Sequence, residues 1–369
     1  MSPTPNPRVL YAKVPGPGLL VAGEHLVYDP APTIDLDEPL RGGFLTKTLL
    51  LSPEPFMRER LRDPAILTYS TPMVVGQPLV GFGLVQVLRS EKEGVTAGDY
   101  MYGFTPWEHY TVQPYVDARF DFAGANYPSY TFDMDSLVLQ PVPDPLGAFP
   151  WSRLTSVLGT PGLTAFVGLE SVAPDMKSGQ TVYVSSGASG VGSMVVQLCK
   201  SKGLRVIASA SSDSKADYIR TLGADVAFNY KTTSVGSALA EHGPLDYYWD
   251  NVCGQQLEQA IQNMALNGVI LACGAISEYN TPAEDCYGVK TLALVFKRRL
   301  RIQGFLVSDG MPTLLPRFLA EVPVLLAQGK LKSEEQLFVG LEKGIEAFLS
   351  LYDGTSKAKP VVVVDAAYA

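Results

Sequence analysis

Residues 181–200 read TVYVSSGASGVGSMVVQLCK, which is a compact β-branched run, a glycine-rich turn and a helical segment in direct succession. In this context a glycine-rich turn lets backbone N–H groups approach a pyrophosphate, and the positive end of the helix adds attraction. The spacing is Gly-x-x-Gly-x-Gly instead of the more specific Gly-x-Gly-x-x-Gly, so a tight turn without a ligand is the competing interpretation. The candidate cofactor ligands in this turn are Gly187, Ala188, Gly190, Val191 and Gly192.

The next strand indicates which dinucleotide the turn would hold. A site for NAD places an acidic residue about 20 positions further on, where it binds the ribose hydroxyl. Here residues 208–212 read ASASS, and the first acid, Asp213, is expected to be the N-cap of the following helix. No carboxylate would repel a 2′-phosphate, so the pattern favours NADP(H) with Ser211 and Lys215 as candidate ligands. The alternative for Lys215 is a solvated position on the helix.

Compact β-branched runs alternate with segments of helical period in the second half of the chain. We expect strands at about 181–185, 205–208, 226–229, 245–249, 268–272, 300–306 and 359–364, and helices at about 163–172, 191–202, 215–222, 258–263, 312–328 and 341–351. Such alternation is typical of βαβ units, in which helices cover both faces of a parallel sheet. The Tyr247-Tyr248-Trp249 run then forms a buried strand, although aromatic residues could also stack on a base.

The first part of the chain has a different pattern. From Thr46 to about Val142, short apolar stretches are broken by turn residues, which is typical of a β-rich, barrel-like unit. The 369 residues are enough for two domains or one large domain. The change near Pro150 favours two, so we expect an α/β protein with a doubly wound parallel sheet and a separate β-rich domain.

Composition excludes several classes of function. The net charge of −8 argues against nucleic acid as a partner, since it would repel a phosphate backbone. The sequence has neither a signal peptide pattern nor 18 consecutive apolar residues, so we expect a cytoplasmic protein without a membrane span. Three isolated histidines and four cysteines without a Cys-x-x-Cys pair predict no metal site. The cysteines, which we expect to be reduced core residues, are Cys199, Cys253, Cys273 and Cys286.

Several longer motifs resemble one protein superfamily. They are residues 54–60 (EPFMRER), 158–166 (LGTPGLTAF), 222–231 (LGADVAFNYK), 249–254 (WDNVCG), 276–280 (ISEYN) and 297–305 (KRRLRIQGF). With the glycine turn and the domain order, they make the chain similar to the medium-chain dehydrogenase/reductase superfamily. Within it the chain looks most like the zinc-independent branch of leukotriene hydroxydehydrogenase/prostaglandin reductases and plant alkenal double-bond reductases. Gly76-Gln77-Pro78 stands where zinc-dependent relatives have Gly-His-Glu.

The resemblance implies both architecture and activity. It implies a GroES-like substrate domain with its first part at 1–150, a Rossmann NADP(H)-binding domain at 151–310, and a C-terminal segment, 311–369, that returns to the substrate domain. The implied activity is 1,4-reduction of an unsaturated carbonyl substrate by NADPH, and the family suggests a possible homodimer. The implied cofactor ligands beyond the turn are Ser211, Lys215, Tyr230, Asn251 and Phe305.

Fewer residues can be assigned to the substrate pocket than to the cofactor site. In the family, the tyrosine that matches Tyr279 lies beside the nicotinamide and the substrate, and we expect either that it donates a hydrogen bond to the enolate oxygen or that it only packs. Phe56, the second pocket candidate, replaces the family's usual tyrosine. The aromatic segment at about 117–137 looks longer than its family equivalent and either reshapes substrate entry or is a surface loop. The alternatives are a quinone, imine or specialised biosynthetic substrate, or a non-catalytic NADPH-binding protein.

Overall fold

A computed structural model describes residues 3–369 apart from 67, 114–138 and 146–147, so the aromatic segment expected at 117–137 lies outside the described residues. The chain divides into two compact units. The first contains residues 1–155, 335–356 and 360–369, and the second contains residues 156–334 and 357–359. Each unit is described by itself below. Residues 311–334 therefore belong to the second unit, although we expected them in the segment that returns to the first.

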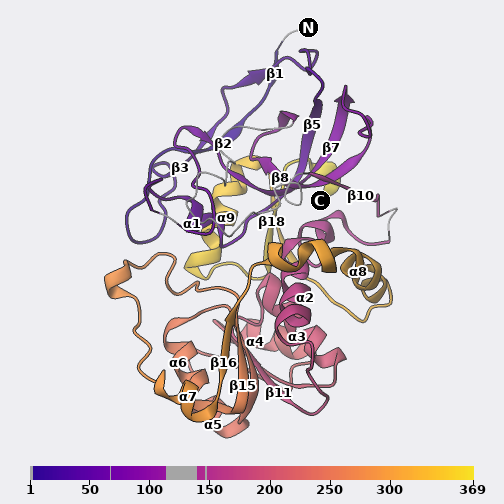
Figure 1. The fold of residues 1–369 in the computed structure, drawn as a ribbon. Helices are drawn as coiled ribbons and strands as arrows, with labels where there is room; N and C mark the ends of the chain where they lie inside the picture. Colours follow the sequence, from indigo (N-terminus) through magenta and orange to yellow (C-terminus); the bar gives the residue numbers. More distant parts are fainter. Residues whose placement is uncertain (1–2, 67, 114–138, 146–147) are drawn as a thin grey trace. The chain divides into compact units, whose positions relative to one another are not determined.

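The second unit is built on a six-stranded parallel sheet with the order β13-β12-β11-β14-β15-β16. Its strands are β11 (Thr181–Val184), β12 (Arg205–Ala210), β13 (Val226–Asn229), β14 (Leu245–Asp250), β15 (Met264–Ala272) and β16 (Arg301–Gly304). Its helices are α2 (Thr160–Val172), α3 (Gly190–Ser201), α4 (Asp213–Thr221), α5 (Val235–His242), α6 (Gly254–Asn263), α7 (Ala293–Arg298) and α8 (Val307–Ala327). The order reverses beside β11, which is where such a sheet binds its ligands. The predicted doubly wound fold is confirmed (Figure 1).

Two hydrophobic clusters cover the two faces of this sheet. Because side chains alternate along a strand, Val182 and Val184 pack with α2, α3 and α8, whereas Tyr183 packs with α5 and α6. The aromatic run is confirmed as a buried parallel strand, since Tyr248 and Trp249 are fully buried in β14 between β11 and β15. The Tyr183 and Tyr248 rings stack with centroids 4.9 Å apart.

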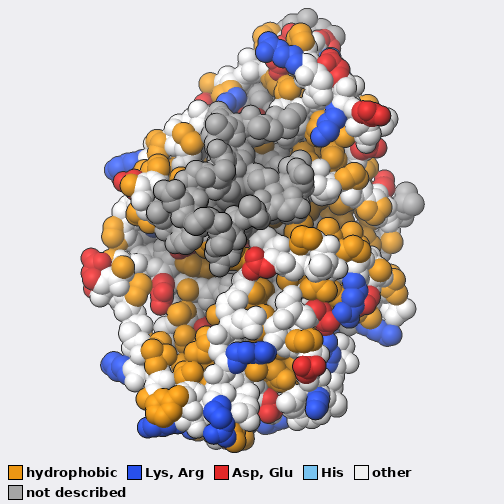
Figure 2. All heavy atoms as spheres, in the orientation of Figure 1, with side chains coloured by type: hydrophobic (Ala, Val, Ile, Leu, Met, Phe, Trp, Pro, Cys, Tyr) orange, Lys and Arg blue, Asp and Glu red, His pale blue; other side chains and the backbone are white. Residues whose placement is uncertain are grey.

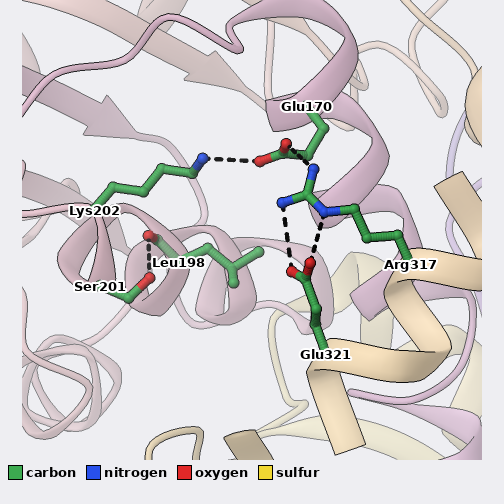
Figure 3. Close-up of polar contacts among 6 residues, drawn as sticks. All are labelled: Glu170, Leu198, Ser201, Lys202, Arg317 and Glu321. Atoms are coloured by element: carbon green, nitrogen blue, oxygen red, sulfur yellow. Dashed lines mark hydrogen bonds and ion pairs between the residues drawn. The ribbon is translucent and has the colours of Figure 1, made fainter.

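Among the described residues, α8 is the one helix that is long and apolar enough to cross a membrane by length and composition alone. Of this apolar window 17% is buried, and a single helix of this kind is weak evidence for a membrane span. Figure 3 shows how it is tied to the rest of the second unit: Arg317 of α8 pairs with Glu170 of α2, which also binds Lys202 at 2.8 Å, and Arg317 Nε binds Glu321 at 2.7 Å. This network fixes α8 to α2 and to the C-terminal end of α3.

The first unit confirms the β-rich prediction. Its main sheet has the order β10-β8-β7-β5-β18-β17, with β9 paired to β5. The strands of that sheet are β5 (Phe44–Ser52), β7 (Val80–Ser90), β8 (Tyr100–Pro106), β9 (Tyr110–Gln113), β10 (Gln140–Val142), β17 (Glu335–Val339) and β18 (Lys359–Val363). Its other described strands and α-helices are β1 (Thr4–Pro5), β2 (Arg8–Tyr11), β3 (Leu26–Asp29), β4 (Thr33–Ile34), β6 (Gln77–Pro78), α1 (Met57–Arg60) and α9 (Gly344–Asp353).

Two local predictions are wrong. Ser212, not Asp213, is the N-cap of α4: its backbone is extended and its hydroxyl accepts the N–H of Lys215, so Asp213 becomes the first helical residue. All four cysteines are free, but only Cys199 is buried, while the other three are partly exposed.

Basic and acidic side chains are interspersed on the face drawn in Figure 2, in keeping with the modest net charge.

Candidate functional site

The glycine turn follows β11 and leads directly into α3. Ser189 caps this helix, because its hydroxyl accepts the N–H of Gly192 at 3.0 Å and its carbonyl accepts the N–H of Ser193. Among the four N–H groups that a helix leaves without an intrahelical partner, those of Gly190 and Val191 remain for a ligand. The N-terminus of α3 can therefore bind an anion.

The glycines also make room for the turn itself. A Cβ on Gly192 would lie 2.2 Å from the carbonyl oxygen of Ser186, and one on Gly187 would lie 2.8 Å from Cβ of Ala208. A Cβ on Gly190 would lie 3.1 Å from Cδ of Lys359. A small pocket beside the turn is lined by Ala188, Ser189, Gly190 and Lys359, among others. The cradle thus fits a dinucleotide pyrophosphate, with backbone donors on one side and a buried lysine stem beside them.

The second group of predicted ligands lies where β12 and β13 end. Ala210 is opposite Asn229 in the sheet, and the N–H of Tyr230 donates to the carbonyl of Ala210 at 3.0 Å. Lys215 Nζ donates to the hydroxyl of Ser211 at 3.3 Å. The structure therefore gathers Ser211, Lys215 and Tyr230 at one sheet edge, as a cofactor 2′-phosphate would require. We call this group the basic cluster; burial raises the pKa of Tyr230, so its hydroxyl stays a neutral donor.

The acidic residue beside the basic cluster is Asp213. It is exposed on the first turn of α4, and its Oδ1 accepts a hydrogen bond from Nδ2 of Asn229 at 3.1 Å. Asn229 is 9% exposed and ends β13. The carboxylate of Asp213 is thus bound by a side chain of the neighbouring strand.

Asn251 lies at the end of β14, where the strand order reverses. Its Nδ2 donates to the carbonyl of Ser185 at 2.7 Å, and its Oδ1 accepts Nε1 of Trp249 at 3.0 Å. The preceding Asp250 is 2% exposed and accepts the hydroxyl of Tyr248 and the N–H groups of Val252 and Cys253. Burial raises the pKa of Asp250 despite these bonds. These contacts fix the orientation of the Asn251 amide before any ligand binds.

Tyr279 lies on the turn that follows β15, beside Asn251. A Cβ on Gly274 would lie 3.2 Å from the hydroxyl oxygen of Tyr279 and 3.5 Å from the carbonyl oxygen of Asn251, so the two residues flank one glycine. The Tyr279 hydroxyl oxygen accepts the N–H of Ala275 at 3.2 Å. The structure therefore places a phenol and a fixed amide at the carboxyl edge of the sheet.

The other predicted residues have different surroundings. Phe305 follows β16, and its ring packs edge-on against Trp249 with centroids 5.4 Å apart, so its side chain belongs largely to the core. Phe56 lies in the first unit, half-buried against Phe82 and Phe104 at 6.1 and 6.2 Å. The structure thus places Phe56 and Tyr279, the two residues predicted for the substrate pocket, in different units.

Two sequence comparisons identify the family. Residues 31–118 match the family model described as the N-terminal domain of oxidoreductase, and residues 190–321 match the model described as zinc-binding dehydrogenase. The dehydrogenase FUB6 of Fusarium oxysporum f. sp. lycopersici is 34% identical over 94% of each chain. This chain is a medium-chain dehydrogenase/reductase.

Two further relatives bear on the activity of this dehydrogenase/reductase. The 2-alkenal reductase (NADP⁺-dependent) of Nicotiana tabacum is 34% identical over 87% of each chain. The solved structure of CurA in complex with NADPH, from Vibrio vulnificus, is 27% identical, with a TM-score of 0.81 over 97% of this chain and 99% of that one. The Fusarium relative is thus a dehydrogenase and the tobacco relative an NADP⁺-dependent reductase, while CurA binds NADPH.

The zinc that the family name implies does not fit the residues at hand. In the part of the chain that the structure describes, no group of three or more His, Cys, Asp or Glu side chains could hold a metal ion. No step of the chemistry below is therefore assigned to a metal.

Sequence reasoning missed two residues of this site. Lys359 lies beside Gly190, and no local motif marks it because it comes from the far end of the chain. Asn229 was part of a quoted motif, but only the tyrosine that follows it was assigned a role. Its contact with Asp213 depends on how β13 lies beside β12, which the sequence indicates only through the alternation of strands and helices.

Proposed function

We propose that this dehydrogenase/reductase is an NADPH-dependent reductase of activated C=C bonds in α,β-unsaturated aldehydes and ketones, of the zinc-independent alkenal reductase branch. The observation that carries the proposal is that the carboxyl edge of the sheet presents two different groups of side chains. The basic cluster at one end suits a 2′-phosphate, and Tyr279 with Asn251 at the other suits a polarised carbonyl. Similarity to the tobacco alkenal reductase supports the substrate class.

The protein residues that would hold the cofactor follow from the geometry. The N–H groups of Gly190 and Val191 bind the pyrophosphate at the N-terminus of α3. Ser211, Lys215 and Tyr230 bind the 2′-phosphate, with Lys215 supplying the charge. Bound NADPH supplies a hydride.

Tyr279 is the residue that we assign to the reaction itself. Reduction at the β-carbon places negative charge on the carbonyl oxygen, and a fixed donor that meets this charge lowers the barrier. The N–H of Ala275 donates to the Tyr279 hydroxyl oxygen, which polarises the O–H bond and strengthens it as a donor. The α-carbon takes its proton from water, so no acid–base pair is needed. Phe56 as a wall of the substrate pocket and Phe305 as a cofactor contact belong to the same proposal.

The test is NADPH oxidation at 340 nm by the purified full chain with a panel of enals, enones, quinones and imines. The proposal expects turnover with enals and enones and a lower KM for NADPH than for NADH. Turnover confined to quinones or imines would contradict the substrate class. If no substrate consumes NADPH while the cofactor raises the melting temperature, the chain is a binding protein and not a reductase.

The proposal also includes a cytoplasmic location and a homodimer, which the family resemblance suggests. Light scattering of the purified chain measures the dimer directly, and a monomer at all concentrations would contradict it.

A further inference from the structure

We propose that Asn229 determines cofactor specificity by holding the Asp213 carboxylate away from the 2′-phosphate. The inference rests on the proposed function, because it requires that the basic cluster binds this phosphate. It assigns a positioning role to Asn229, which acts through Asp213 and not by touching the cofactor.

Asp213 is placed in the sequence where its negative charge could repel a 2′-phosphate. It comes two residues after Ser211 and two before Lys215, on the first turn of α4. Sites for NAD use an acid at the end of this second strand to bind the ribose hydroxyl, and that same charge repels a phosphate. The turn therefore contains the residue type that selects NADH, at a position displaced by only a few residues.

The amide of Asn229 can face Asp213 in only one way. Its Oδ1 accepts the N–H of Lys231 at 3.0 Å, and an N–H group can be met only by the oxygen of the amide. The Nδ2 group is consequently the end that points to Asp213. The carbonyl of Asn229 also accepts the N–H groups of Thr232 and Thr233, which fixes the backbone that presents this amide.

Helix capping does not account for the contact between Asn229 and Asp213. Ser212 already caps α4 through the N–H of Lys215, so Asp213 is not needed for that purpose. A carboxylate on the first turn of a helix is favoured by the helix dipole. A charged group that is useful neither as a cap nor as a ligand is held by a neutral donor, and this pairing separates its charge from the phosphate.

The experiment compares 2′,5′-ADP with 5′-AMP as probes, because the two differ by the 2′-phosphate alone. Titration calorimetry on the full chain gives Kd for each probe, and no turnover is involved. In Asn229→Ala we expect Kd for 2′,5′-ADP to rise about fivefold at low salt and Kd for 5′-AMP to stay within twofold. The rise should shrink in 1 M NaCl, because salt screens exposed charges.

The matched control removes the charge that Asn229 is proposed to hold. Asp213→Asn alone should bind both probes as the wild type does, and Asp213→Asn in the Asn229→Ala background should restore 2′,5′-ADP binding. If Asn229→Ala does not fold, Asn229→Asp keeps the shape and the Lys231 bond but repels Asp213, and it should lose affinity for 2′,5′-ADP in the same way.

The possible outcomes separate two failures. Equal weakening of both probes, or no rescue by Asp213→Asn, makes Asn229 purely structural and overturns the inference while the cofactor assignment stands. A wild-type chain that does not prefer 2′,5′-ADP to 5′-AMP overturns the assignment of the basic cluster and the inference with it.

Discussion

Two aspartates lie along the carboxyl edge of the parallel sheet, after the strands on either side of β11, and their surroundings differ. Asp250, after β14, is buried and binds a tyrosine hydroxyl and two backbone N–H groups, so its charge is used to shape its own turn. Asp213, after β12, is exposed and binds the side chain of Asn229. The first carboxylate fixes the turn that follows Asn251, whereas the second is held by the amide of Asn229. The part of the edge that follows β14 therefore orients a polar amide, whereas the part that follows β12 contains the basic cluster. We call these two parts the orienting end and the binding end.

The largest expected effect comes from the glycine turn after β11, the strand that lies between β12 and β14. Gly192→Ala places a Cβ 2.2 Å from the Ser186 carbonyl oxygen, which is backbone and cannot yield without moving the turn. We expect NADPH binding to be lost, with Kd raised at least ~100-fold, and the melting temperature to fall. Calorimetry and thermal unfolding measure the two effects. Gly288→Ala, where no atom lies within 4 Å of a new Cβ, is the matched control and should behave as the wild type.

Tyr279→Phe tests the orienting end alone. Loss of a donor to a developing oxyanion costs on the order of 100-fold in rate, so kcat with a small enone should fall by about that factor. Kd for NADPH should stay unchanged, because the ring is retained. Steady-state kinetics with one small enone measures kcat, and unchanged turnover would reduce Tyr279 to a packing role.

Lys215→Ala tests the binding end alone. A hydrogen bond to a charged group contributes roughly 1.5–3 kcal/mol, so KM for NADPH should rise about tenfold or more while KM for NADH and kcat change little. Lys177→Ala, on an exposed loop of the same unit, is the control for loss of one positive charge. Equal increases in KM for NADPH and NADH would show that Lys215 does not bind the 2′-phosphate.

The smallest expected effect is a change in pH dependence. Because burial raises the pKa of Asp250, the native state holds its proton more tightly than the unfolded state does. The associated stability is present below the unfolded pKa and is lost as pH rises through the native one. In Asp250→Asn the free energy of unfolding should therefore decline less between pH 4 and pH 8. Urea unfolding measures this, and an unchanged or steeper decline would contradict the raised pKa.

The sequence predicted the α/β architecture well because both faces of the parallel sheet are buried. Strands such as β11, in which Val182, Tyr183 and Val184 are fully buried, then read as short apolar runs. Shorter elements such as α5 and β17 were missed, since a turn or two of helix or an edge strand leaves too weak a periodic signal. The glycine turn and Lys215 were found because their spacing is local.

Other parts of the site depend on the fold itself and could not be predicted. Ser212 and Asp213 are both good N-caps, and only the backbone at residue 212 decides between them. The contact between Asn229 and Asp213 exists because β13 pairs with β12, and Lys359 reaches Gly190 from a distant part of the sequence. These features of the site depend on contacts between residues that are far apart in the sequence, so no local motif could predict them.

The most direct test of the account is the position of the transferred hydrogen. An enone is reduced with NADPH that carries deuterium at C4, and the product is examined by NMR and mass spectrometry. The account predicts a saturated ketone with deuterium on the β-carbon. An allylic alcohol with deuterium on the carbonyl carbon would contradict it.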